Sequence, residues 1–317
     1  MAAILIIQGG CYIPNMGKTS IALSQHHFRT GWLLAVGGTA LFALKSIFIK
    51  LAYAQGVDTV TLLTLRMLVA APFYLLMLGW LLRQTPTRIP APKPLAAIML
   101  LGFMGYYLSS WLDMQGLNYV SAQLERLTLY TYPIMTTLLG WVFLREAITP
   151  RIMLALVLTY SGVMLLYAHE ANLGGADVTL GVAMVATAAL IFAFYVVFSK
   201  GLIGQFGSRL FTSIAMLAST LFVCIHFLLT HRVSDLLVNP TAWGYALLLG
   251  IFSTVLPSFM VSEAIGRIGA ARTSIVGTSG PLITILLAVA LLGEPFGWFH
   301  LAGMLLVMLG VGALGKK

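Results

Sequence analysis

The sequence repeats itself at an interval that constrains the whole fold. Pro133 is followed thirteen residues later by Glu146, and Pro281 is followed at the same distance by Glu294. A shift of 148 residues superposes these pairs, and it matches further residues: Ala122 with Ala270, Leu144 with Leu292, Gly162 with Gly310, and Gly102 with Gly250. Each copy contains about five apolar segments, and an odd number of spans would place the second copy upside down relative to the first. We therefore predict two inverted repeats that share a site near the middle of a membrane.

The composition favours a membrane-embedded chain and excludes several other classes. Of the 317 residues, 60% are hydrophobic and 9% are charged, whereas soluble domains carry about 25% charged residues. Backbone that faces lipid has to satisfy its own hydrogen bonds, as helices do. The net charge of +9 does not indicate a nucleic-acid partner, because no soluble basic domain carries it. Cys11 and Cys224 are too few and too far apart for a disulfide framework or a metal site.

Ten apolar stretches of about 20 residues, the length that the hydrocarbon core requires, can be placed along the chain. They cover residues 31–54, 59–82, 95–113, 122–144, 152–168, 180–203, 209–229, 242–263, 272–292 and 298–314. Residues 1–30 lack the features of a signal peptide and are expected to form a cytoplasmic tail, with Met16 as an alternative start to Met1. Residues 169–179 are polar and Gly-rich and are expected to join repeat 31–168 to repeat 180–317. The predicted fold is an all-α integral membrane protein with ten transmembrane helices in two inverted five-helix repeats.

The positions of Lys and Arg predict how these helices are oriented. With the N-terminus inside, 13 of the 18 Lys and Arg residues fall in cytoplasmic segments. The opposite loops hold only Arg232, and the other four basic residues lie inside spans. Loops with an excess of Lys and Arg stay in the cytoplasm, so both termini are predicted to be cytoplasmic. The short loops are typical of a multi-pass protein of the bacterial inner membrane.

Ionisable side chains inside the first repeat are the main candidates for a binding site. A charge at the bilayer centre costs about 2.5–3.5 kcal/mol on insertion scales, so it needs a partner or an aqueous cavity. The predicted spans of the first repeat contain six such residues: Lys45, Lys50, Arg66, Asp113, Glu125 and Arg126. Arg66 lies roughly 12 Å beyond Asp58 at 1.5 Å per residue, too deep to reach the headgroups easily. The excess of bases favours a substrate with a carboxylate, and snorkelling to the headgroups is the alternative for the residues near the interfaces.

Two charge pairs are predicted to gate the site. Arg126 is expected to pair with Asp113 or Glu125 near the outer end, with direct contact to the substrate as the alternative. Glu263 and Arg272 occupy the cytoplasmic ends of two spans in the second repeat. By inverted symmetry, we expect these two residues to gate the inner end.

Helix-breaking and aromatic residues complete the candidate site. Gly277, Gly280 and Pro281 lie in the most interrupted stretch within a predicted span. Such interruptions at corresponding places in two halves indicate a transport site, and close packing of small residues is the alternative. Tyr107 and Trp111 share a helix face because they are four residues apart. With Tyr130 on the next span, they are expected to form either an aromatic wall for the substrate or a packing stripe.

Several motifs resemble one known family. Residues 116–122 (GLNYVSA), 125–126 (ER), 132–133 (YP) and 143–146 (FLRE), with their echoes at 269–272 (GAAR), 280–281 (GP) and 291–294 (LLGE), are similar to those of EamA-type transporters of the drug/metabolite transporter superfamily. The similarity covers residues 31–315. The resemblance implies a ten-helix exporter of amino acids, metabolites or drugs, but it does not name a substrate.

We therefore predict a secondary transporter that exports small metabolites, amino acids or related carboxylates, by alternating access. A nucleotide-sugar or drug carrier of the same superfamily is the closest alternative. An integral-membrane transferase would need clustered carboxylates or histidines, whereas the four aspartates are scattered singly, so we expect no enzyme activity, no metal and no cofactor. The expected partners are a small-molecule substrate, the lipid bilayer and, if Glu125 or Asp113 carries it, a proton as the coupling ion.

Overall fold

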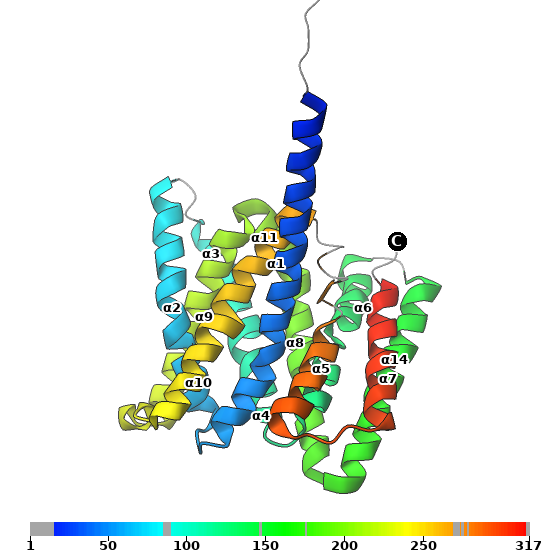
Figure 1. The fold of residues 1–317 in the computed structure, drawn as a ribbon. Helices are drawn as coiled ribbons and strands as arrows, with labels where there is room; N and C mark the ends of the chain where they lie inside the picture. Colours follow the sequence, from blue (N-terminus) through cyan, green and yellow to red (C-terminus); the bar gives the residue numbers. More distant parts are fainter. Residues whose placement is uncertain are drawn as a thin grey trace, which may run out of the picture.

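The structure of the chain is a computed structural model, and it describes residues 16–84, 90–145, 148–174, 176–268, 273, 276–277 and 279–314. Within these residues every regular element is helical. The helices form one bundle, from which the N-terminal part of α1 projects at one end (Figure 1).

The helical elements follow one another with short connections. The first half contains α1 (Met16–Tyr53), α2 (Thr59–Gln84), α3 (Pro92–Gly102), the π-helical turn η2 (Phe103–Leu108), α4 (Ser109–Gly116), α5 (Ala122–Leu129), α6 (Tyr132–Leu144) and α7 (Pro150–Gly174). The second half contains α8 (Ala176–Phe206), α9 (Ser208–Thr230), the 3-10 turn η3 (Val233–Leu236), α10 (Pro240–Gly250), the π-helical turn η4 (Ile251–Val255), α11 (Leu256–Ile268), α13 (Gly280–Leu287), the π-helical turn η5 (Ala288–Leu292) and α14 (Trp298–Leu314).

Seven helices of the described part are long and apolar enough to cross a membrane. They are Phe28–Tyr53, Thr59–Gln84, Pro92–Gly116, Ile152–Asn172, Asp177–Phe206, Ser208–Thr230 and Pro240–Val261. Gly280–Leu292 and Trp298–Ala313 are shorter apolar helices. The predicted span 122–144 is divided between α5 and α6 by a break at Tyr130 and Thr131. The chain is thus a multi-pass helical membrane protein, and the predicted count of ten includes three segments that are short or broken.

Two segments that were expected outside regular structure are largely helical. Residues 16–30, assigned to the tail, belong to α1. In the predicted loop 169–179, α7 continues to Gly174 and α8 begins at Ala176. Contacts explain why residues 169–174 are helical: the ring of His169 stacks on Phe299 with centroids 4.6 Å apart, and Glu170 accepts hydrogen bonds from Ser121. The polar residues here have partners on neighbouring elements, which a count of polar residues cannot reveal.

Elements of the two halves begin and end at matching positions. α3 and α10 both begin at a proline and end at a glycine 148 residues apart, and each continues into a π-helical turn. α6 and the α13–η5 segment also start and end 148 residues apart. Each is followed by a left-handed residue, Arg145 with φ 57° and Gly293 with φ 67°. The spacing found in the sequence therefore extends to the local backbone conformation.

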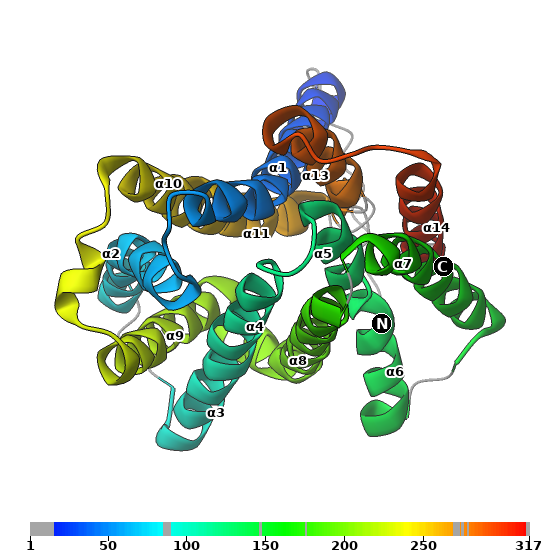
Figure 2. The ribbon, with the colours of Figure 1, turned by 90° about the horizontal axis from the view of Figure 1, so that it is seen from below.

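Close packing holds particular helices side by side. α7 and α14 run along each other in both views (Figures 1 and 2). Small residues make this possible, because a Cβ on Gly162 would lie 2.6 Å from the carbonyl oxygen of Gly303. α1 packs on α11 and α13, and α2 packs on α9. Figure 2 shows α5 near the middle of the bundle, where it contacts α1, α4, α7, α8 and α13.

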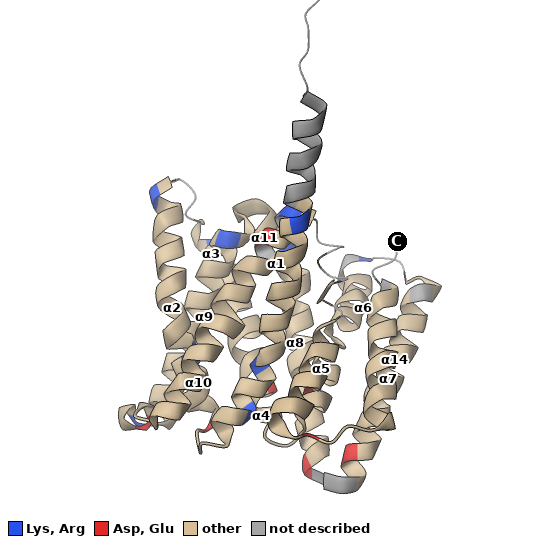
Figure 3. Cartoon of the chain, in the orientation of Figure 1, with Lys and Arg blue, Asp and Glu red and all other residues tan. Residues whose placement is uncertain are grey.

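Charged residues are distributed unevenly along the bundle. Most Lys and Arg lie at the upper end in Figure 3, and most Asp and Glu lie in the lower half. The upper end carries the N-terminal part of α1, which the sequence predicted to be cytoplasmic. A smaller set of buried charges comes from α1, α2, α4 and α5, and these are the residues that the sequence singled out.

Candidate functional site

An ion pair between α1 and α4 lies within the buried set of charges. Nζ of Lys45 donates to Oδ2 of Asp113, whose side chain is 3% exposed. Both α1 and α4 pack against α5, which brings together two residues that are far apart in the sequence. The prediction that Asp113 pairs with Arg126 is wrong for the described residues, because the ion pair is made by Lys45. Each charge of this pair offsets part of the cost of burying the other.

Glu125 is a second buried carboxyl group, and it has no ion pair to offset the cost of burying its charge. It lies in the first turn of α5 and is fully buried. Its Oε2 accepts a hydrogen bond of 2.6 Å from the hydroxyl of Ser46 on α1. Its Oε1 has no hydrogen-bond partner in the described part of the chain. A buried carboxylate with one neutral partner is costly as an anion, so the position suits a group that binds a proton or a cation.

Arg126 of α5 connects its own helix to α13 and α1 by hydrogen bonds. Its Nε donates to Thr284 Oγ1 of α13 at 3.0 Å. Its Nη2 donates to the carbonyl oxygens of Phe42 and Ala43 on α1, at 2.8 and 3.4 Å. No carboxylate of the described residues forms an ion pair with it, so its expected pairing with Glu125 is also wrong. The neighbouring residues on α5 therefore divide their roles, since Arg126 holds helices together while Glu125 remains weakly bonded.

Arg66 of α2 is a buried base with few polar partners. It is 6% exposed. Its Nε donates to Thr254 Oγ1 of η4 at 2.9 Å, and its Nη1 lies 3.8 Å from the sulfur of Met114. Within the described residues no carboxylate pairs with it. A guanidinium carries five N–H donors in a fork that matches a carboxylate, so most of this capacity is free for an anionic ligand.

The predicted aromatic pair forms a cluster with α9. Tyr107 Oη and His226 Nδ1 lie 3.0 Å apart in a hydrogen bond. The rings of Tyr107 and Trp111 lie 5.8 and 5.7 Å from the His226 ring. His226 is thus both hydrogen-bonded and packed against the two rings. The indole nitrogen of Trp111 is buried without a hydrogen-bond partner among the described residues, so this cluster retains an unused donor.

The broken helices meet at Tyr130. The hydroxyl of Tyr130, at the break between α5 and α6, donates to the carbonyl oxygen of Gly277 at 2.9 Å. A Cβ on Gly280 would overlap the same hydroxyl, so only glycine allows this approach. Pro281 occupies the first turn of α13, where a proline costs no hydrogen bond. The two interrupted segments of the two halves thus touch, which the sequence could not show.

At the lower end of the bundle, a carboxylate from the second half caps α5. Glu294 accepts hydrogen bonds from the backbone N–H groups of Ala122 at 2.7 Å and Gln123 at 3.3 Å. Glu170 accepts from the backbone and the hydroxyl of Ser121. Carboxylates are stabilised at a helix N-terminus by its unpaired N–H groups and dipole. The sequence marked Glu294 as part of the repeat but did not indicate this role, and it gave no sign of Glu170.

At the upper end, Glu263 forms a small ion-pair network. It lies two residues past the candidate span Pro240–Val261 and accepts from Arg209 at 3.0 Å and Arg267 at 2.9 Å. The hydrogen bond from Arg267, above all, holds the pKa of Glu263 below its usual value. Arg272, its predicted partner, lies outside the described residues. The two pairs still link α9 with α11 at the basic end.

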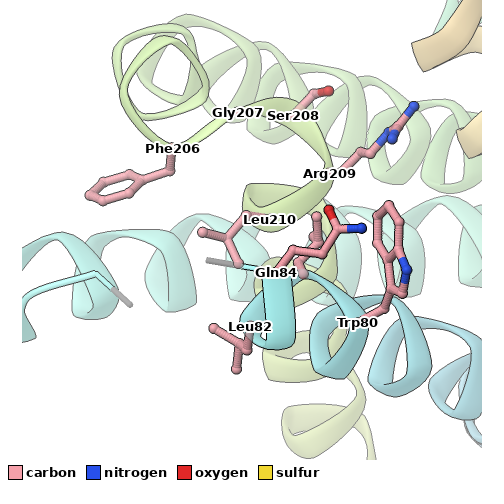
Figure 4. A pocket seen from close by; sticks show the side chains of 9 residues that line it. Trp80, Leu82, Gln84, Phe206, Gly207, Ser208, Arg209 and Leu210 are labelled. Carbon is pink, nitrogen blue, oxygen red and sulfur yellow. The ribbon is translucent and has the colours of Figure 1, made fainter. Parts of the chain in front are cut away.

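A cavity of about 320 Å³ opens beside this network (Figure 4). It lies between the end of α2 and the junction of α8 with α9, with Trp80 and Arg209 on one side and Phe206 on the other. A second cavity, of about 260 Å³, includes Ser121, Glu170 and His300 in its lining. None of the residues predicted to bind a substrate lines either cavity. Both cavities therefore mark the ends of the bundle rather than the buried charges.

The sequence of this chain is similar to a known protein family and to several transporters. The EamA-like transporter family matches residues 29–168 and 179–315. The uncharacterized transporter YcbK of Bacillus subtilis is 28% identical over 286 residues, which cover 86% of this chain and 88% of that protein. An uncharacterized transporter of Archaeoglobus fulgidus is 26% identical over 226 residues, covering 71% of this chain and 79% of its own length.

One solved crystal structure has the same fold. It superposes with a TM-score of 0.63 at 16% sequence identity and covers 90% of this chain and 97% of its own. At this identity the likeness concerns the fold alone. The relatives named above are described as transporters, without a stated substrate.

Proposed function

Because this chain belongs to the EamA-like transporter family, we propose that it is a secondary transporter that exports small metabolites by alternating access. The substrates proposed are amino acids with an apolar or aromatic side chain, or related carboxylates. The family and the relatives named as transporters point to transport rather than to an enzyme.

Two inverted five-helix repeats provide the proposed architecture. The support comes from the elements that start and end 148 residues apart, including the π-helical turns after α3 and α10. We propose that residues 31–168 and 180–317 are the two repeats, with 1–30 before them and 169–179 between them. Ten membrane crossings follow if the short and broken segments also span the bilayer. Inverted repeats of this kind provide a midplane site that opens to either side in turn.

The proposed location is the bacterial inner membrane, with both termini in the cytoplasm. The gathering of Lys and Arg at one end of the bundle supports this orientation (Figure 3). In this arrangement, the Glu263 network lies at the cytoplasmic end, and the Glu294 cap lies at the outer end. Reporter fusions at Lys317 and between Arg83 and Lys93 should both report cytoplasm. A periplasmic signal at either position would contradict the orientation.

The substrate class rests on one observation above all. Arg66 is buried, and its hydrogen-bond partners among the described residues are neutral, so a substrate carboxylate would supply an opposite charge in direct contact. A buried cation gains from a hydrogen-bonded anionic partner. The cluster of Tyr107, Trp111 and His226 offers apolar and aromatic surface on the outer half of the same bundle. A carboxylate at Arg66 and an apolar side group at the cluster describe an amino acid.

The test is counterflow into liposomes that contain the purified full-length protein. Vesicles loaded with unlabelled phenylalanine should take up labelled phenylalanine, and phenylalaninamide, which lacks the carboxylate, should compete far less well. Empty liposomes are the control. Counterflow limited to nucleotide sugars or to quaternary-ammonium drugs would contradict the proposed substrate class and support the alternative carriers.

A further inference from the structure

We infer that Asp113 and Glu125 together hold one proton, and that the ammonium group of the substrate displaces this proton. This inference rests on the proposed transport of amino acids and names the coupling ion of that site. It makes the protein an exchanger in which one proton enters for each amino acid that leaves.

The geometry of the two carboxyl groups carries the inference. Their side chains are close enough for one to donate a hydrogen bond to the other. Each has one oxygen with an established partner: Lys45 for Asp113 and the Ser46 hydroxyl for Glu125. The second oxygen of each, Asp113 Oδ1 and Glu125 Oε1, is buried without a hydrogen-bond partner in the described part of the chain. One proton shared by the two groups would give both oxygens a hydrogen-bond partner, because a protonated carboxyl group donates and a carboxylate accepts.

The charged surroundings decide which group takes up the proton. Lys45 of α1 and Arg126 of α5 face both carboxyl groups. Lys50 and Tyr130 face Glu125, whereas Tyr53 of α1 and Arg66 of α2 face Asp113. From α13 the neighbour is Thr284, a neutral side chain bonded to Arg126. Lys45 binds Asp113 directly, which favours the charged form of Asp113. Glu125 has no such ion pair, so the proton belongs on Glu125.

The same arrangement suits an ammonium group. With one proton the two carboxyl groups carry a single negative charge, on Asp113, which forms an ion pair with Lys45. Arg126 also acts on both groups, but its hydrogen bonds go to Thr284 and to α1 carbonyl oxygens. Loss of the proton leaves two unpartnered carboxylate oxygens, Asp113 Oδ1 and Glu125 Oε1, and the N–H donors of the substrate ammonium would satisfy both. Two carboxylates in contact disfavour each other's ionised form, so a proton and an ammonium group would compete for the place between them.

The exchange balances in atoms and charge. On the cytoplasmic side, the O–H bond of Glu125 breaks, the proton passes to water, and the ammonium nitrogen takes its place between the carboxylates. On the outer side, a proton from water re-forms the O–H bond and the amino acid leaves. A zwitterion has no net charge, so each cycle moves one positive charge inward. Transport should therefore respond to the membrane potential as well as to the pH difference.

Infrared spectroscopy of the purified full-length protein tests the shared proton without any transport. A band of a protonated carboxyl group is expected at neutral pH in the wild type. It should be absent in Glu125→Gln and unchanged in Asp177→Asn, an exposed carboxylate at the start of α8. The same band in Glu125→Gln, or no band in the wild type, would overturn the shared proton.

Proteoliposomes test the exchange. With the membrane potential clamped, a lumen one pH unit more acidic than the outside should drive phenylalanine accumulation up to about tenfold, the ratio that one pH unit supplies to a one-for-one exchange. Glu125→Gln should lose this accumulation, while N-acetylphenylalanine, without an ammonium group, should not be exchanged for protons. Normal counterflow with no effect of the pH difference would refute the exchange and leave the proposed transport intact. Absence of counterflow for every amino acid would instead refute the proposed substrate class, and the infrared band would still decide on the proton.

Discussion

Replacement of Arg66 by methionine should abolish tight substrate binding without damaging the fold. The guanidinium is buried and forms no ion pair or hydrogen bond with a carboxylate of the described residues, so its main proposed role is to bind the substrate carboxylate. A hydrogen bond to a charged group contributes about 1.5–3 kcal/mol, and the arginine fork can donate two of them. Loss of both at the lower limit is about 3 kcal/mol, which corresponds to roughly a 100-fold rise in the half-saturating concentration.

The fold should tolerate this change for two reasons. Thr254, which loses the hydrogen bond from Arg66, still donates to the carbonyl oxygen of Leu249 at 2.9 Å. Methionine fills most of the space of the arginine stem and removes a buried charge, which is favourable inside a membrane. The amount of folded protein in the membrane should therefore stay near the wild-type level.

Counterflow of labelled phenylalanine over a range of concentrations is the assay. Arg66→Lys should lose roughly tenfold, because an ammonium group is a point charge without the bidentate fork and keeps about one of the two bonds. Arg83→Met, an exposed arginine on the same helix, is the matched control and should behave as the wild type. Unchanged affinity in Arg66→Met, or an equal loss in Arg83→Met, would refute the assignment.

Three further changes test the packing and the ends of the bundle. Arg145→Gly should raise the stability by about 1 kcal/mol, because a side chain in the left-handed region at φ 57° is strained; thermal unfolding in detergent measures it, and a lower melting temperature would contradict the argument. Gly162→Leu should separate α7 from α14, since even a Cβ would lie 2.6 Å from the Gly303 carbonyl oxygen. The yield of folded monomer in gel filtration should fall sharply, and an unchanged yield would exclude the close contact. The pKa of Glu263 is held below its ordinary 4.5, so its ion pairs should stabilise the protein fully above that pH and lose their effect as the pH falls further. The difference in melting temperature between wild type and Glu263→Gln should therefore shrink only below about pH 4.5. A difference that does not depend on pH would count against the ion pairs of Glu263.

The sequence alone determined the properties that depend on neighbouring residues. The apolar stretches define a helical membrane protein, because backbone in lipid has to bond within its own segment. The start of α13 at Gly280 and Pro281 falls in the stretch that the sequence marked as interrupted, since proline is favoured in the first turn of a helix. Residues 122–144 read as one apolar span in the sequence, whereas the structure divides them between α5 and α6. The paired spacing also indicated the family, because a duplicated chain keeps its local turns at a constant offset.

Only the tertiary structure decided how the buried charges pair. Asp113 meets Lys45 rather than Arg126, because α1 and α4 both pack against α5, and no helical periodicity reports which faces of separate helices meet. Arg126 instead hydrogen-bonds α13 and the backbone of α1. Glu294 caps a helix that starts 172 residues earlier in the chain. Charge type and depth in the membrane are properties of a single segment, whereas the partner of each charge depends on how several segments pack together, and this is why the candidate residues were visible in the sequence but their pairing was not.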